Sequence, residues 1–369
     1  MSTQHDAAPR SLSEVAAFQK NLIPVNIPEI YALNPMLLSI ASDENIRKGV
    51  IAFRDCLLSL LDRLISDGHL YAKPSSKGDY PLLGYISNLL LDTGYYGKLA
   101  ESGDSLLITE LPSCTASIDG NGKKKSPLIP VSGQIECLRL LTRCGFVFAG
   151  IDLDAKKPDI SQCSAVSYPS NPHLLTGLKA MAVAELELRT TRRYSNDNNL
   201  LRCDYRMLKA EASDMSDVLK DFLYPLPEKT QEFALKLHRR YTDKGLTCIN
   251  TRLGIISFAY VYTGNSRRAM SERDIYAKRV WEFSYSIKNG YCLFVRAKKT
   301  DKYADIIEKF PAFLQEKIAQ GYGCYKKLGR ERCQVDCQGI GLPLDDSILD
   351  ISGDIETWLD NEMPGALRK

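Results

Sequence analysis

The segment over residues 281–297 constrains the fold of this chain more than any other. Aromatic or apolar residues occupy positions 281, 283, 285 and 287, and an Asn289-Gly290 pair separates them from a second β-rich run. Strict alternation is typical of a half-buried strand, and Asn-Gly suits the two positive-φ positions of a type I′ turn. The sequence therefore predicts a β-hairpin here and an antiparallel sheet around it.

The length of the chain, 369 residues, is enough for two or three domains. Pro225-Leu226-Pro227 stiffens the chain and stops the preceding helix, so it marks the predicted boundary. We expect a disordered tail over 1–11, a mainly helical domain with short strands over 12–226, and an α+β domain over 227–369 that ends in an acidic tail. The predicted fold class is α+β.

Apolar periodicity predicts several helices in the first domain. One is bracketed by Ser42 and Gly68, and a second begins at Pro81 and is predicted to end at Gly94. A third is expected over 173–188.

Other patterns point to strands and loops. Residues 200–208 are predicted to form a strand. Residues 113–127 contain Asp119-Gly120-Asn121-Gly122 followed by three lysines, which indicates an exposed loop. Beyond Pro227 we expect a helix over 228–241, β-rich runs over 247–262, the hairpin, and a helix over 303–319. This order predicts an antiparallel sheet with flanking helices.

The net charge of +3 hides an uneven distribution along the chain. Residues 229–332 hold 22 Lys and Arg against 10 Asp and Glu, whereas residues 333–369 hold 2 against 8. A basic domain can attract a polyanion. Alternatively, the acidic tail can fold back and neutralise the basic segment within the molecule. The sequence leaves both interpretations open.

Basic pairs recur in the C-terminal part and are interleaved with tyrosines. Cations hold phosphates and aromatic rings stack on bases, so this mixture is compatible with single-stranded nucleic acid. The candidate anion-binding residues are Arg239, Arg240, Arg267, Arg268, Lys298 and Lys299. The leading interpretation is a binding or regulatory module whose basic C-terminal domain contacts an anionic partner, with nucleic acid as one candidate.

Two other functions fit the sequence. Trp281, Phe283 and Tyr285 could line the apolar pocket of a small-molecule sensor, or they could simply fill the core. The third function is an enzyme without a recognisable motif, since the chain has neither a phosphate-binding glycine loop nor a nucleophile elbow. Cys248 and His238 could form a nucleophilic pair only if the fold brings them together.

Cys324, Cys333 and Cys337 form the densest group of cysteines. Structural zinc sites usually present a Cys-x2-Cys pair, which this chain lacks, so the three fit a metal site poorly and we expect no metal and no cofactor. Scattered cysteines without an export signal favour reduced thiols in a cytoplasmic protein. No run approaches the roughly 20 apolar residues that span a bilayer, so we expect no membrane partner.

Residues 303–337 combine a predicted helix, the run Gly321-Tyr322-Gly323-Cys324-Tyr325-Lys326-Lys327, and two further cysteines. This stretch resembles uncharacterised bacterial proteins in which an α+β module ends in a cysteine-bearing tail. Those proteins carry more cysteines at closer spacing, so this chain departs from the part of the pattern that suggests metal. The resemblance implies a bacterial source and supplies no activity.

Overall fold

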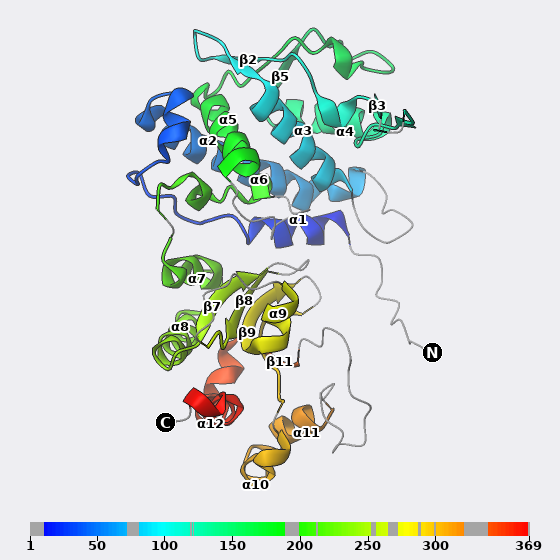
Figure 1. The fold of residues 1–369 in the computed structure, drawn as a ribbon. Coiled ribbons are helices and arrows are strands. Elements are labelled where there is room, and N and C mark those ends of the chain that lie inside the picture. The colour runs from blue at the N-terminus through cyan, green and yellow to red at the C-terminus, as the bar shows by residue number, and fades with distance from the viewer. Residues whose placement is uncertain are drawn as a thin grey trace. The chain divides into compact units, whose positions relative to one another are not determined.

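The structure is a computed structural model that describes residues 11–71, 81–118, 120, 122–188, 199–211, 213–251, 256–264, 272–286, 289–298, 300–320 and 339–367. The described chain divides into two compact units between Ser213 and Asp214. The predicted α+β class is confirmed: helices dominate the N-terminal unit, and a five-stranded antiparallel sheet forms the C-terminal unit (Figure 1). The predicted tail over 1–11 lies outside the described residues, except for Ser11.

The observed division precedes the double proline because of helix α7 (Met215–Leu223). Phe222 of this helix packs against Phe258 and Tyr291, with ring centroids 4.8 and 5.1 Å apart. Both partners lie on the C-terminal sheet. Buried aromatic pairs contribute strongly to packing, so α7 belongs to the C-terminal unit.

The N-terminal unit is built from six α-helices within the described residues and a small sheet. The helices are α1 (Leu12–Lys20), α2 (Asp43–Asp67), α3 (Leu82–Tyr96), α4 (Val131–Arg143), α5 (His173–Val183), which continues as a π-helical turn over Ala184–Leu188, and α6 (Asn199–Arg202). The sheet has the order β1 (Lys98–Leu99), β2 (Ser105–Leu107), β6 (Ala165–Ser167) and β5 (Val147–Ala149). A separate hairpin joins β3 (Ser117–Ile118) to β4 (Lys124–Lys125).

The predicted ends of α2 are confirmed, whereas the predicted end of α3 is wrong. Ser42 Oγ accepts a hydrogen bond from the Asn45 N–H at 3.3 Å, and Gly68 follows the last helical residue. Helix α3 continues past Gly94 to Tyr96. A Cβ atom at position 94 would lie 2.7 Å from the Ala182 Cβ, so this glycine permits close packing on α5 instead of ending the helix.

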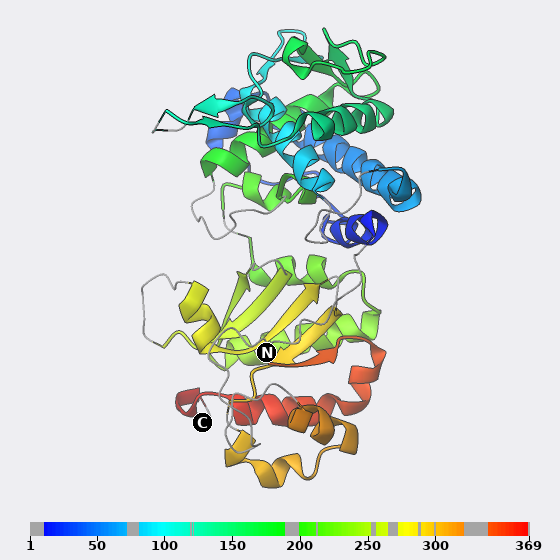
Figure 2. The ribbon, with the colours of Figure 1, turned by 90° about the vertical axis from the view of Figure 1, so that its right-hand side faces the viewer.

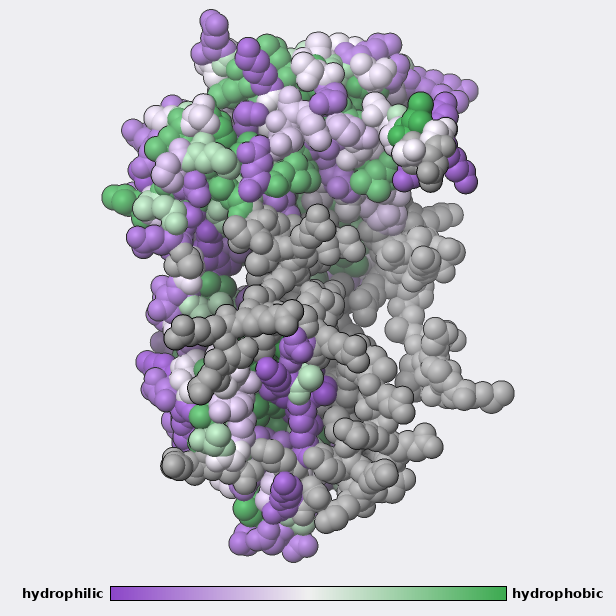
Figure 3. All heavy atoms as spheres, viewed as in Figure 1, coloured by the Kyte–Doolittle hydropathy of each residue, from purple (hydrophilic) through white to green (hydrophobic). Residues whose placement is uncertain are grey.

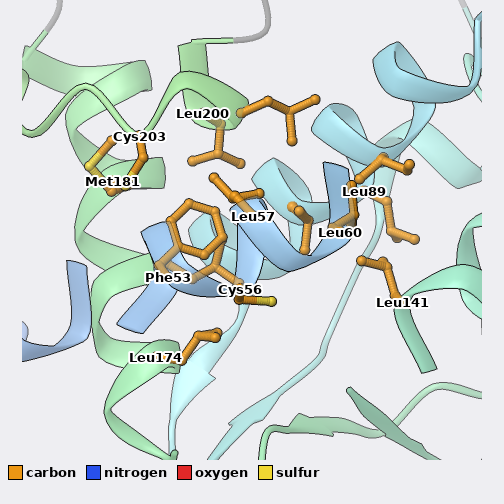
Figure 4. Close-up of a cluster of buried hydrophobic side chains, with 14 of the residues drawn as sticks. Phe53, Cys56, Leu57, Leu60, Leu89, Leu141, Leu174, Met181, Leu200 and Cys203 are labelled. Carbon is orange, nitrogen blue, oxygen red and sulfur yellow. The ribbon is translucent and has the colours of Figure 1, made fainter. Parts of the chain in front are cut away.

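The core of the N-terminal unit surrounds α2, as Figure 4 shows. Phe53 and Leu57 of this helix meet Leu174 and Met181 of α5, and all four side chains are buried. The predicted strand over 200–208 is wrong, because these residues form α6 and a 3-10 turn over Tyr205–Leu208. Their apolar side chains enter the same core from short helical turns.

The C-terminal unit contains a sheet in which each strand is antiparallel to its neighbours. Its order is β11 (Ile340–Pro343), β10 (Gly290–Val295), β9 (Arg279–Ser286), β8 (Ile256–Val261) and β7 (Thr247–Thr251). The helices of this unit besides α7 are α8 (Glu228–Asp243), α9 (Glu272–Lys278), α10 (Ala304–Ile307), α11 (Ala312–Gln320) and α12 (Ser352–Glu362). Figure 2 shows the sheet between these helices.

The two faces of this sheet contact different helices. On one face, Tyr260 and Trp281 pack with Tyr241 of α8. On the other face, Ala259 clusters with Ile275 of α9. Because successive residues of a strand point to opposite sides, the neighbours Ala259 and Tyr260 belong to different layers.

The predicted hairpin is confirmed, but its turn is not type I′. Ser286 of β9 pairs with Gly290, so Gly290 is the first residue of β10 and not a turn residue. Gly290 has a φ of 63°, whereas Asn289 does not have positive φ, which a type I′ turn requires at both central positions. The predicted helix over 303–319 is also interrupted, because Pro311 cannot donate a helical hydrogen bond and separates α10 from α11.

Candidate anion site after strand β10

A pair of charged side chains lies buried on the face of the sheet opposite Trp281. Arg279 and Glu282 are 2% and 1% exposed. Arg279 Nη1 donates to Glu282 Oε2 at 2.5 Å, and Ser257 Oγ donates to the same oxygen at 2.6 Å. Charged groups are rarely this buried unless they are paired, so the contact sets the local arrangement of β8 and β9.

A register irregularity in the sheet makes this pair possible. Residues three apart on a regular strand point to opposite faces. The pairing of β8 with β9 shifts between Tyr260 and Val261, so that Val261 pairs with Arg279. An extra residue in β9 therefore returns Arg279 to the side of Glu282.

Arg296 follows β10 directly. Its backbone N–H donates to Val280 O at 2.9 Å, and its side chain is half-buried. Nε and Nη1 are shielded from solvent and make no hydrogen bond to any residue in the described part of the chain. A buried donor left without an acceptor costs about 1–3 kcal/mol, and more when it is charged. A guanidinium in this state is suited to bind an anion, whose oxygen atoms can accept hydrogen bonds from the unpaired N–H groups.

The backbone just after Arg296 is held in an unfavourable conformation. Ala297 is buried and has a φ of 48°, a left-handed conformation that costs an L-residue about 1–2 kcal/mol. Gly339 passes close by: a Cβ atom there would lie 2.2 Å from Val295 O and 3.1 Å from the Arg296 Cα. Strained residues of this kind concentrate at binding sites, which adds a second observation at the same place.

Lys298, one of the predicted anion-binding residues, is fixed by α12. Its backbone N–H donates to Glu362 Oε2 at 2.8 Å, and its ammonium donates to Ala277 O at 2.5 Å. Glu362 is buried and also accepts a hydrogen bond from the Tyr303 hydroxyl. Trp358 Nε1 donates to that hydroxyl at 3.1 Å. The segment 296–298 therefore enters the C-terminal core at a defined position.

The acidic tail folds back on α8, which is one of the two interpretations that the sequence allows. Arg240 binds both Glu356 and Asp360 of α12. Lys236 lies 2.6 Å from Glu356, and Lys244 lies 2.6 Å from Asp360. The positive charge of this side of α8 is thus largely neutralised within the molecule.

The other predicted anion-binding residues are Arg239, Arg267, Arg268 and Lys299. Arg239 is exposed on α8. Arg267, Arg268 and Lys299 lie outside the described residues, as do the cysteines Cys324, Cys333 and Cys337. Within the described ranges, no group of three His, Cys, Asp or Glu side chains is arranged to hold a metal ion.

The three aromatic residues predicted for a ligand pocket occupy different environments. Trp281 and Phe283 are fully buried, and Trp281 stacks on Tyr260 with ring centroids 3.5 Å apart. Tyr285 is half-buried and stacks on Tyr291 with centroids 4.2 Å apart. The first two rings therefore fill the core, which is the second interpretation that the sequence offers for them.

His238 and Cys248 are joined indirectly through Tyr260. His238 Nδ1 lies 2.8 Å from the Tyr260 hydroxyl, and its Nε2 lies 3.0 Å from Ser216 Oγ. Cys248 of β7 lies opposite Tyr260 in the sheet. Burial raises the pKa of the Cys248 thiol to about 12, so the thiolate needed for nucleophilic attack does not form near neutral pH.

Several residues that define this site are not among the anion-binding residues predicted from the sequence. Arg296 lies only two positions before Lys298, so the cluster of basic residues over 296–299 was a sequence signal that could have identified it. Glu362 and the strain at Ala297 depend on contacts between distant segments and have no local pattern. Figure 3 shows that hydrophilic residues are spread over much of the described surface in this view.

In comparisons with known proteins, no family model, no curated protein and no solved structure matches the chain. Among the described helices, none has both the length and the apolarity needed to cross a membrane.

Proposed function

We propose that the chain is a cytoplasmic binding or regulatory module, of bacterial source, whose C-terminal unit binds an anionic group of a partner through Arg296. The shielded Nε and Nη1 donors of this side chain carry the proposal. A carboxylate or a phosphate would supply both the missing acceptor and the opposite charge. Binding would therefore remove an energetic cost that the unliganded protein bears.

The surroundings of Arg296 support a preorganised site. Gly339 and the Val280 carbonyl hold the backbone on either side, and Glu362 anchors the chain at Lys298. The backbone then needs little ordering when a ligand arrives, although the atoms that shield Nε and Nη1 must move to admit it. The ammonium of Lys298 adds positive charge two residues from Arg296.

One shielded guanidinium fits a single anionic group better than a row of phosphates. A small carboxylate or phosphate ligand would make the module a sensor, and this is the form of the proposal that Arg296 favours. Nucleic acid as the partner of the C-terminal unit stays a prediction, supported by the positive balance over 229–332 and by the exposed Arg239. An enzymatic role also stays a prediction.

Thermal unfolding of the full chain in the presence of inorganic phosphate, acetate or chloride at constant ionic strength tests the proposal. A ligand at about 100 times its Kd stabilises the native state by about 2.7 kcal/mol, which a Tm measurement detects. We expect phosphate or acetate to raise the Tm of the wild type. Arg296→Met should abolish this increase, because methionine fills similar space without donors.

The matched control is Arg239→Met, which removes an exposed cation from the same unit and should keep the full response. In chloride alone, Arg296→Met should be at least as stable as the wild type, because two unsatisfied donors disappear. A purely structural arginine would give the opposite sign. A wild type that responds to neither anion, or an Arg296→Met variant that responds normally, would remove the proposal.

A further inference from the structure

The hairpin β3–β4 of the N-terminal unit is exposed to solvent. Every described residue from 115 to 126 is exposed, and Ile118 reaches 75% exposure. Figure 2 shows the hairpin projecting from the body of its unit. Two strands without a covering layer are only marginally stable in water, so these residues, here named the lysine ribbon (115–118 and 122–126), need an explanation.

The base of the lysine ribbon is firmly anchored, although the ribbon itself is solvated. Gln134, a buried residue of α4, donates through Nε2 to Cys114 O at 2.9 Å and to Ile129 O at 2.8 Å. The Ile129 N–H donates to Ser113 O at 2.8 Å. One side chain thus ties together the two chain segments from which the ribbon emerges.

A second buried group strengthens the same anchor. Asp92 of α3 accepts a hydrogen bond from the Ser113 N–H at 2.6 Å. Burial raises the pKa of this carboxyl, while the hydrogen bonds from Ser113 oppose the increase. Buried polar contacts of this kind fix one conformation, so the ribbon has a defined direction of exit.

The strand register distributes positive charge over both faces of the lysine ribbon. Lys124 pairs with Ile118, and Lys125 pairs with Ser117. Because side chains alternate along a strand, Lys124 and Lys125 point to opposite faces. The exposed Lys123 precedes them. A narrow ribbon with cations on two sides matches a partner that surrounds it with negative charge, whereas a flat membrane would meet only one side.

We propose that the lysine ribbon binds in the major groove of double-stranded DNA and contacts the phosphates on its two walls. The B-DNA major groove is about 12 Å wide and admits a two-stranded β-ribbon, whereas the major groove of duplex RNA is narrow. Lysines bind phosphates as point charges, so the contact is independent of base sequence. This inference concerns the N-terminal unit and does not depend on Arg296.

Fluorescence anisotropy with a labelled B-form duplex, measured on the full chain over a series of salt concentrations, tests the inference. Each phosphate contact adds about −0.9 to the slope of log K against log salt. The double variant K124Q/K125Q should therefore make the slope shallower by about 1.8. Its Tm should equal that of the wild type, because both side chains are exposed.

The matched control is K156Q/K157Q, which removes two adjacent exposed lysines from the same unit. It should leave the slope close to that of the wild type. The inference is overturned if the duplex does not bind at low salt, or if both double variants change the slope equally. Binding to phosphatidylserine vesicles or duplex RNA in preference to DNA would also overturn it.

Discussion

The backbones of Gly49 and Gly177 lie directly against each other where α2 crosses α5. A Cβ atom on Gly177 would lie 2.1 Å from the Gly49 carbonyl carbon, and one on Gly49 would lie 2.5 Å from the Gly177 nitrogen. Glycine lowers helix stability by about 1 kcal/mol relative to alanine, so two glycines inside helices need compensation. Here the compensation is the close packing of the two central helices.

Substitution of Gly177 by alanine should destabilise the N-terminal unit by about 1–3 kcal/mol, because the added methyl group forces α2 and α5 apart. Urea unfolding followed by circular dichroism measures this loss. Gly84→Ala is the control, since nothing lies within 4 Å of a Cβ atom at that position of α3. The control should be neutral or stabilising by up to about 1 kcal/mol. Equal losses in the two variants would show that the helix contact is unimportant.

Lys179→Met should weaken the junction between α3 and α5. The Lys179 ammonium donates to the carbonyls of Gly94, Tyr95 and Gly97, the last at 2.7 Å. These groups end a helix, so a cation there satisfies acceptors and the helix dipole together. We expect a loss of about 1–3 kcal/mol in urea unfolding. The exposed Lys48, which pairs with Glu44 on one helix face, is the control, and its substitution should cost under about 0.5 kcal/mol.

The ion pairs between α8 and α12 should make stability fall in acid. Burial alone would raise the pKa of Asp360, but hydrogen bonds from Lys244 and Tyr241 and the charge of Arg240 outweigh it and lower the pKa. A carboxyl whose pKa is lowered by folding stabilises the fold at pH values above its pKa in the unfolded chain, near 3.9. This contribution is lost as the pH falls through the lowered pKa of the folded protein. Asp360→Asn should cost about 1 kcal/mol at pH 7 and flatten the acid limb in denaturant titrations. Asp350→Asn, at an exposed site, should leave that limb unchanged.

His238 should cause a second decrease in stability, at a higher pH than the decrease caused by Asp360. Burial lowers its pKa, which the charge of Asp214 partly offsets, so the folded protein holds the imidazole neutral. The unfolded chain binds a proton near pH 6.5, and stability therefore falls as the pH drops below that value. Guanidinium unfolding between about pH 8 and about pH 5 should show this fall in the wild type and much less of it in His238→Gln. An exposed histidine, His69, provides the comparison, and His69→Gln should behave like the wild type.

Much of the fold could be predicted because its signals are local. Ser42 begins α2 through a cap that involves only the neighbouring Asn45 N–H, and Gly68 follows the last residue of this helix. The hairpin follows from the alternation of apolar and polar residues along β9, but this strand is not half-buried as predicted, because Glu282 and Ser284 on its polar face are buried as well. The errors arise where a distant contact determines the conformation. Gly94 lies inside a helix because α5 packs against it. Residues 200–208 form short helical turns instead of a strand because their leucines enter a core built on α2.

The candidate site was harder to predict for the same reason. Lys298 was selected by its charge, but its position depends on Glu362, which comes from the last long helix. Arg240 was selected on the same ground, and the structure pairs it with Glu356 and Asp360 instead of leaving it free. Composition gives the number of charges in a segment, whereas tertiary packing decides which of them lack partners.

The edge position of β11 has a consequence for the order in which the sheet assembles. Strands β7 to β10 follow one another as neighbours, but β11 joins β10 only after the chain has passed through α10 and α11. Closing the long segment between β10 and β11 costs conformational entropy. The four-stranded meander should therefore form first, and β11 should dock late. Until then the free edge of β10 can pair with another chain, which makes this strand the expected starting point for aggregation during refolding.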